Sequence, residues 1–205
     1  MLSEDLTLSR NMWSFGYKGL HREFKLGLRI LNTGSSLLSD AEHKTIEIST
    51  RKVEEFLGVK LPHPEVHRIS DQGYGMYLEG VILYGPTGDE EVDERILIHE
   101  LAHLAQNIYC RPRFPVLHAL VEGIPLILGL RRGKLLRFLQ FTEGFATWVE
   151  ESIMGERGES YWLSLPVFYR VVYYEGKKKF ERMGRDLGIR YGLGEGEFCR
   201  RLTSH

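Results

Sequence analysis

The stretch Ile98-His99-Glu100-Leu101-Ala102-His103-Leu104 lies in a segment with helical apolar spacing, expected from about Glu90 to Ile108. Four residues advance an α-helix by about 400°, so His99 and His103 project from one face, one turn apart. Two imidazoles at this spacing can bind one Zn²⁺ ion, with Glu100 beside a water molecule that the ion holds. A carboxylate there can take a proton from that water. The stretch therefore predicts a helix that carries two metal ligands and a general base.

The residues on either side of this helix predict where it begins and ends. Gly85-Pro86-Thr87-Gly88 is typical of a turn, and Asp89-Glu90-Glu91 places negative charge at the helix N-terminus, where the helix dipole favours it. Pro112 and Pro115 prevent the helix from continuing. The metal-binding motif is therefore expected near the middle of a helix with defined ends.

Before this helix, the chain reads as a small sheet with one further helix. Apolar spacing predicts a helix over 49–57, ended by Gly58. Residues 66–70 and 75–84 are rich in β-branched and aromatic residues and predict strands. Residues 24–30 alternate in polarity, which favours a strand over a helix.

After this helix, the chain reads as helical. We expect helices over 117–130, 135–154 and 167–187, followed by a loose glycine-rich tail from Gly188. The fold class is thus α+β, with a small mixed sheet and the motif helix over a helical lower lobe. The expected division is an upper lobe of residues 1–110 and a lower lobe of residues 111–205, which together form one compact unit.

A catalytic zinc site usually needs a third protein ligand, and a downstream glutamate is the natural candidate. Glu143 lies among apolar neighbours in the predicted 135–154 helix, and a buried carboxylate needs a partner such as a metal. Gly144 and Ala146 are small enough to let two helices approach closely. Glu122, in Glu122-Gly123-Ile124-Pro125, is an alternative third ligand, but Pro125 would bend the expected 117–130 helix close to it.

Two motifs give the chain a specific family resemblance. His-Glu-Leu-Ala-His at 99–103 and Glu-Gly-Phe-Ala-Thr-Trp-Val-Glu at 143–150 resemble the gluzincin metallopeptidases, and the second is similar to the glutamate helix of the aminopeptidase N family. The resemblance spans about residues 66–176, and the small size is closer to minimal gluzincins. It implies a zincin-like, thermolysin-like catalytic core that hydrolyses peptide bonds in a peptide or protein substrate. The implied site has one Zn²⁺ per chain on His99, His103 and Glu143, with Glu100 as base.

The resemblance also implies supporting elements around the zinc. Residues 80–84 are similar to the edge strand of these enzymes, to which a peptide substrate can add. Tyr173-Tyr174-Glu175-Gly176 resembles a Tyr-x-x-Gly motif whose tyrosine donates to the oxyanion, so Tyr173 and Tyr174 are both candidates. Thr147, one turn after Glu143, is either an orienting residue or an ordinary helix residue. The family's Gly-x-Met-x-Asn segment, which grips the substrate amine, is absent from the sequence.

Composition restricts the remaining possibilities. The 205 residues carry 27 Lys and Arg against 28 Asp and Glu, a net charge of −1 that makes a nucleic-acid partner unlikely. We expect no signal peptide, because the N-terminus is acidic and lacks an apolar segment. We also expect no membrane span, because the apolar stretch 116–130 is short and interrupted. Cys110 and Cys199 cannot make a disulfide scaffold and are typical of a reducing compartment, which favours a cytoplasmic location.

One alternative to an active peptidase remains open. The protein could keep the gluzincin fold as a latent enzyme, or as a non-catalytic metal-binding scaffold. The missing amine-gripping segment and the hard-to-interpret first 40 residues both motivate this alternative.

Overall fold

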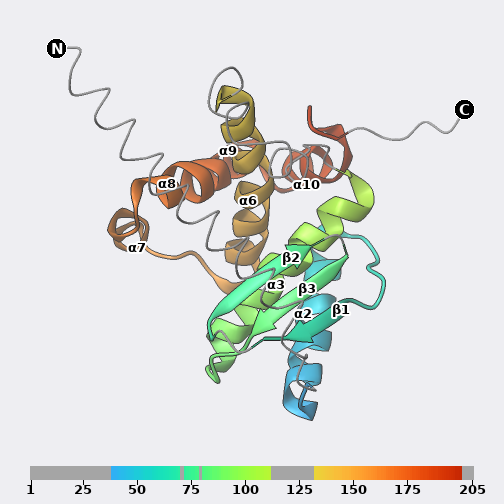
Figure 1. Cartoon of the computed structure of the whole chain (residues 1–205). Coiled ribbons are helices and arrows are strands. Elements are labelled where there is room, and N and C mark those ends of the chain that lie inside the picture. The colour runs from blue at the N-terminus through green and yellow to red at the C-terminus, as the bar shows by residue number, and fades with distance from the viewer. Residues whose placement is uncertain (1–37, 70–71, 79, 112–131, 200–205) are drawn as a thin grey trace, which may run out of the picture.

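The computed structural model describes residues 38–69, 72–78, 80–111 and 132–199 (Figure 1). The expected 24–30 strand and 117–130 helix, and the alternative ligand Glu122, lie outside these residues. The strands are β1 (Glu65–Arg68), β2 (Tyr74–Leu78) and β3 (Val81–Gly85). The α-helices are α2 (Asp40–Leu57), α3 (Glu90–Tyr109), α6 (Arg132–Met154), α7 (Glu159–Ser164), α8 (Val167–Tyr169), α9 (Glu175–Met183) and α10 (Arg185–Arg190). Two π-helical turns are η1 (Arg170–Tyr174) and η2 (Tyr191–Glu195). The α+β class is confirmed.

The described sheet has three strands in the order β1-β3-β2, with β1 parallel and β2 antiparallel to β3. A small mixed sheet was expected, but the segment predicted as one strand over 75–84 is two strands. Residues 75–84 form two strands, because a turn at Gly80, with φ of +105°, folds them into a hairpin. The prediction that 80–84 is an edge strand was therefore wrong: β3 is central and β2 lies at the edge.

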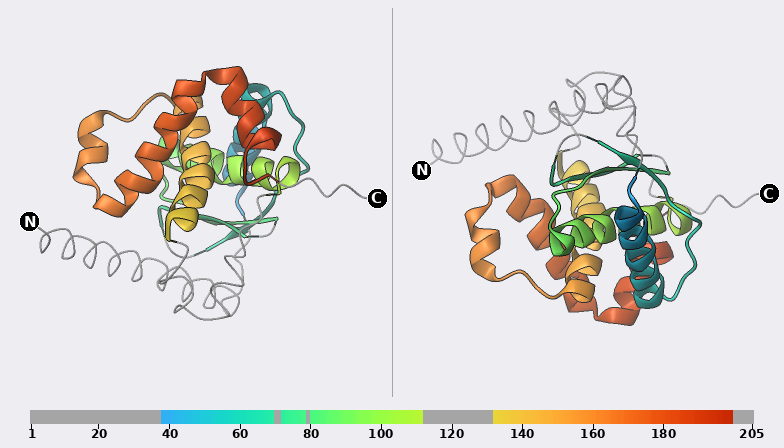
Figure 2. Two further views of the ribbon diagram at one scale, coloured as in Figure 1. Left: turned by 90° about the horizontal axis from the view of Figure 1, so that it is seen from above. Right: turned by 90° about the horizontal axis from the view of Figure 1, so that it is seen from below.

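Helices α2 and α3 cover one face of the sheet, and the later helices pack beyond them (Figure 2). Helix α2 begins at Asp40, earlier than expected, because Ser39 and Glu42 form a reciprocal capping box. Helix α3 matches its prediction closely, since the Asp89 side chain accepts from two backbone N–H groups of the first turn. The buried side chains between these layers include Val53, Ile82, Leu97 and Leu101.

Helices α6 and α9 cross at two glycines. A Cβ on Gly144 would overlap the backbone of Gly176, and a Cβ on Gly176 would lie 2.6 Å from the Gln140 carbonyl oxygen. Hydrogen alone at both positions lets the two backbones touch. The expectation that Gly144 permits a close helix approach is confirmed. The crossing places α6, which carries Glu143, against the helix that follows η1 and Tyr173.

The C-terminal region departs from its predictions. The expected 167–187 helix includes the π-helical turn η1 and ends at Met183, because Gly184 adopts a φ of +73°. Within the described part of the expected tail, residues 188–199, the chain is packed rather than loose. A Cβ on Gly188 would lie 2.9 Å from the Trp148 ring, and one on Gly192 would overlap the Phe145 ring. Glycine in this tail serves close packing.

Cys110 and Cys199 form a disulfide, although 89 residues separate them in the sequence. Cys110 ends α3, and the C-terminal segment returns to the same end of that helix. The two cysteines therefore do not support the expected reducing compartment. None of the described helices is both long and apolar enough to cross a membrane.

Candidate metal centre

Helices α3 and α6 bring three potential ligands together. His99 and His103 lie one turn apart on α3, and the Nε2 atoms of both face the same carboxylate oxygen of Glu143 on α6. The distances to Glu143 Oε2 are 3.4 Å from His99 and 3.3 Å from His103. Ligand atoms at 2.0–2.1 Å from a tetrahedral zinc lie about 3.3–3.4 Å apart, so both distances to Glu143 fit a shared ion. All three ligand atoms lie within 4.8 Å of one another.

The electrostatics of the three residues also fit a cation. Burial lowers the pKa of His99, but hydrogen bonds to Glu143 and Glu150 outweigh it and raise this pKa to about 10. Burial would raise the pKa of Glu143, yet the charges and hydrogen bonds of His103 and His99 hold it well below its usual range. Both pKa shifts reflect a preference for positive charge beside the Glu143 carboxylate, and a divalent ion between the three side chains would supply it.

The three side chains remain partly exposed to solvent. The exposed fractions are 15% for His99, 13% for His103 and 23% for Glu143. Three protein ligands with a solvent-facing position distinguish a catalytic metal site from a closed structural one. Among the described residues, this is the group of His, Cys, Asp and Glu side chains that could hold a metal ion.

Glu100 lies between the metal site and the edge strand. It is 6% exposed, and burial raises its pKa, against the attraction of His99 and His103 and a hydrogen bond from the Tyr77 backbone N–H. A carboxylate with a raised pKa accepts a proton more readily near neutral pH. Strand β2 approaches closely because Gly75 has no side chain: a Cβ there would lie 2.8 Å from Glu100 Oε1 and 2.6 Å from Ile96 Cγ2.

The other nitrogen of His99 faces a buried carboxylate that the sequence did not single out. Its Nδ1 lies 3.6 Å from Oε2 of Glu150, which is 2% exposed. Arg157 binds both oxygens of Glu150, at 2.6 and 3.1 Å, and Arg95 binds one of them at 3.3 Å. This arrangement orients the His99 ring through Nδ1, the nitrogen that does not face Glu143. A signal was present, because Glu150 follows Glu143 by two helical turns and projects from the same face.

The structure separates the two tyrosine candidates. Tyr173 stacks on the His99 ring, with 6.0 Å between the ring centroids, and lines the pocket beside Glu100. Tyr174 instead stacks on Trp162, and the Lys178 ammonium lies 3.9 Å above its ring centroid. Tyr173 therefore belongs to the site, and Tyr174 packs away from it.

Thr147 does not contact the carboxylate of Glu143. Its hydroxyl donates to the Glu143 backbone carbonyl at 2.7 Å, one turn back along α6. This hydrogen bond is the ordinary one of a threonine inside a helix. Of the two roles considered for Thr147, the structure therefore supports that of an ordinary helix residue. Thr147 also helps to line the pocket next to His99.

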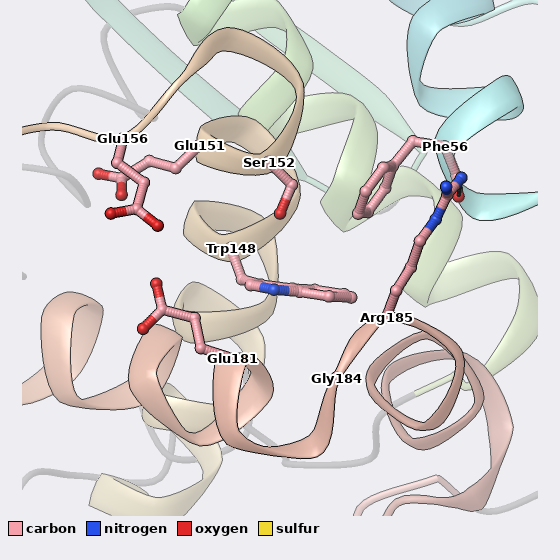
Figure 3. Close-up of a pocket in the computed structure, with 8 residues that line it drawn as sticks. All are labelled: Phe56, Trp148, Glu151, Ser152, Glu156, Glu181, Gly184 and Arg185. Carbon is pink, nitrogen blue, oxygen red and sulfur yellow. Dashed lines mark hydrogen bonds between the residues drawn. The ribbon is translucent and has the colours of Figure 1, made fainter.

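A second hollow, of about 390 Å³, lies beside Trp148 and contains none of the metal-site residues (Figure 3). Figure 3 shows carboxylates on one side of the Trp148 ring and Phe56 on the other. Two of those carboxylates, Glu151 and Glu181, already bind Lys177. Two of its three carboxylates are therefore compensated, and the hollow is separate from the metal site.

No family model, curated protein or solved structure matches the chain.

Proposed function

We propose that the protein is a zinc-dependent peptide-bond hydrolase of the gluzincin type, with a zincin-like catalytic core. The observation that carries the proposal is that His99, His103 and Glu143 converge at the spacing of a zinc ligand set while Glu100 lies between them and an edge strand. A structural metal site does not need a buried carboxylate beside the ligands. A peptidase needs one as its base.

Each residue has a separate task in this proposal. A bound Zn²⁺ would polarise the peptide carbonyl and acidify a water molecule. Glu100 takes the proton of the attacking water and passes it to the leaving amine. Strand β2, at the edge of the described sheet, pairs with an extended peptide and aligns its scissile bond. Glu150 keeps the His99 ring in place through both steps.

A peptide digest tests the proposal directly. A diverse peptide mixture is incubated with zinc-loaded protein, with chelator-treated protein, and with chelated protein to which Zn²⁺ has been returned. We expect cleavage products, read by mass spectrometry, only in the first and third samples, with about one zinc bound per chain. Stoichiometric zinc without any cleavage would instead favour the latent or non-catalytic alternative.

The two neighbouring tyrosines provide a matched pair of variants. Tyr173→Phe removes the hydroxyl of a ring that stacks on His99, and we expect kcat to fall by about 10²–10³-fold if this hydroxyl donates to the oxyanion. Tyr174→Phe should leave kcat within about twofold, because Tyr174 packs on Trp162. Steady-state kinetics on one peptide measures both variants. Equal rates for the two would remove Tyr173 from the mechanism.

A further inference from the structure

A pocket of about 230 Å³ opens directly beside the metal site, with His99 and Glu100 in its wall. It lies between α3, α6 and the segment from α7 to η1. Its apolar wall is formed by Ile96, Tyr161, Trp162, Leu165, Tyr169 and Tyr173. Because His99, Glu100 and Tyr173 belong both to this pocket and to the site, a side chain that enters it belongs to a residue that flanks the scissile bond.

The polar end of the pocket is already neutralised. Arg95 and Arg157 both bind Glu150, and Arg95 also binds Glu91. Arg95 additionally donates to the backbone carbonyls of Met154 and Gly155. A charged substrate side chain would lose its hydration here without gaining a free partner of opposite charge.

The size and surface of the pocket fit an aromatic or large aliphatic side chain. A cavity of about 150 Å³ is large enough to bind benzene, so this larger volume accommodates an aromatic ring. Tyr161 and Tyr169 remain 44% and 39% exposed at the same place. Aromatic rings exposed around a polar-rimmed pocket are typical of a surface that a ligand covers.

Resting on the proposed function, we infer that this pocket selects substrates with an aromatic or large apolar residue next to the scissile bond. Backbone pairing with strand β2 does not depend on the sequence of the substrate, so the segment from α7 to η1 supplies the side-chain preference. The specificity of the site would then depend on residues that hold neither the metal nor the water.

A binding experiment tests this inference without turnover. Blocked dipeptide amides, acetyl-Ala-X-amide with X as Phe, Leu, Ala or Glu, are titrated into zinc-loaded Glu100→Gln protein, and the affinities are read from NMR shifts. We expect Phe and Leu to bind about tenfold or more tightly than Ala, and Glu to bind more weakly than Phe. Equal affinities, or no binding of any probe, would overturn the inference.

Two leucines of the same segment provide a matched control. Leu165→Trp fills the pocket and should remove most of the preference for Phe over Ala. Leu163→Trp makes the same change at a side chain that is 57% exposed and outside the pocket, and should retain that preference. Identical behaviour of the two variants would contradict the assignment. If Phe peptides bind preferentially but are not cleaved by wild-type protein, the pocket stands and the proposed hydrolase activity fails.

Discussion

Glu100→Gln is expected to reduce peptide cleavage by about 10²–10⁴-fold while the protein still binds one zinc per chain. Glutamine has the shape of the carboxylate, so it fits the space left by Gly75, but it cannot take a proton. The three proposed ligands are unchanged by this substitution. Zinc stoichiometry from metal analysis and kcat/KM on one peptide separate the two effects.

A second glutamate of α3 controls for the loss of charge. Glu94→Gln removes a carboxylate that is 13% exposed and pairs with Lys52, outside the pocket beside the site. We expect this variant to keep its activity within about twofold. The proposed mechanism is wrong if Glu100→Gln cleaves as fast as wild type, or if both glutamine variants lose activity equally.

The correct predictions about α3 relied mostly on local periodicity along the sequence. The spacing of His99 and His103 depends only on the rise and twist of one helix, so their shared face followed from the sequence. Helix α3 has capping and breaking residues close to its ends, which is why its bounds were nearly correct. Glu143 became a candidate third ligand through its apolar neighbours, and the family resemblance favoured it over Glu122; the convergence of the three side chains agrees with this assignment.

Features that depend on contacts between distant segments were the ones missed. The two halves of the 75–84 segment share β propensity, and only the pairing of Leu78 with Val81 shows that the chain reverses there. Cys110 and Cys199 meet only because the C-terminal segment packs back onto the end of α3. Glu150 lay inside a quoted motif, but its role depends on Arg95 and Arg157, which come from different elements.

The crossing of α6 and α9 is where the fold and the site are most tightly linked. Gly144→Ala would place a methyl group against the backbone of Gly176, which cannot move aside as a flexible side chain could. We expect the free energy of unfolding to fall by about 3 kcal/mol, at the upper end of the usual cost of overpacking. Because Glu143 precedes Gly144, zinc affinity should fall as well. Denaturant unfolding and a zinc titration measure both quantities.

A substitution at another glycine of α6 distinguishes the expected overlap at Gly144 from a change in helix propensity. A Cβ on Gly133 would meet nothing within 4 Å, and the residue is exposed. Gly133→Ala should therefore stabilise the protein by up to about 1 kcal/mol, since alanine favours a helix. If Gly144→Ala behaves like Gly133→Ala, the two helices do not need their close approach. If only Gly144→Ala loses stability and zinc together, then the glycine that follows Glu143 sets the distance at which α6 packs and presents its ligand.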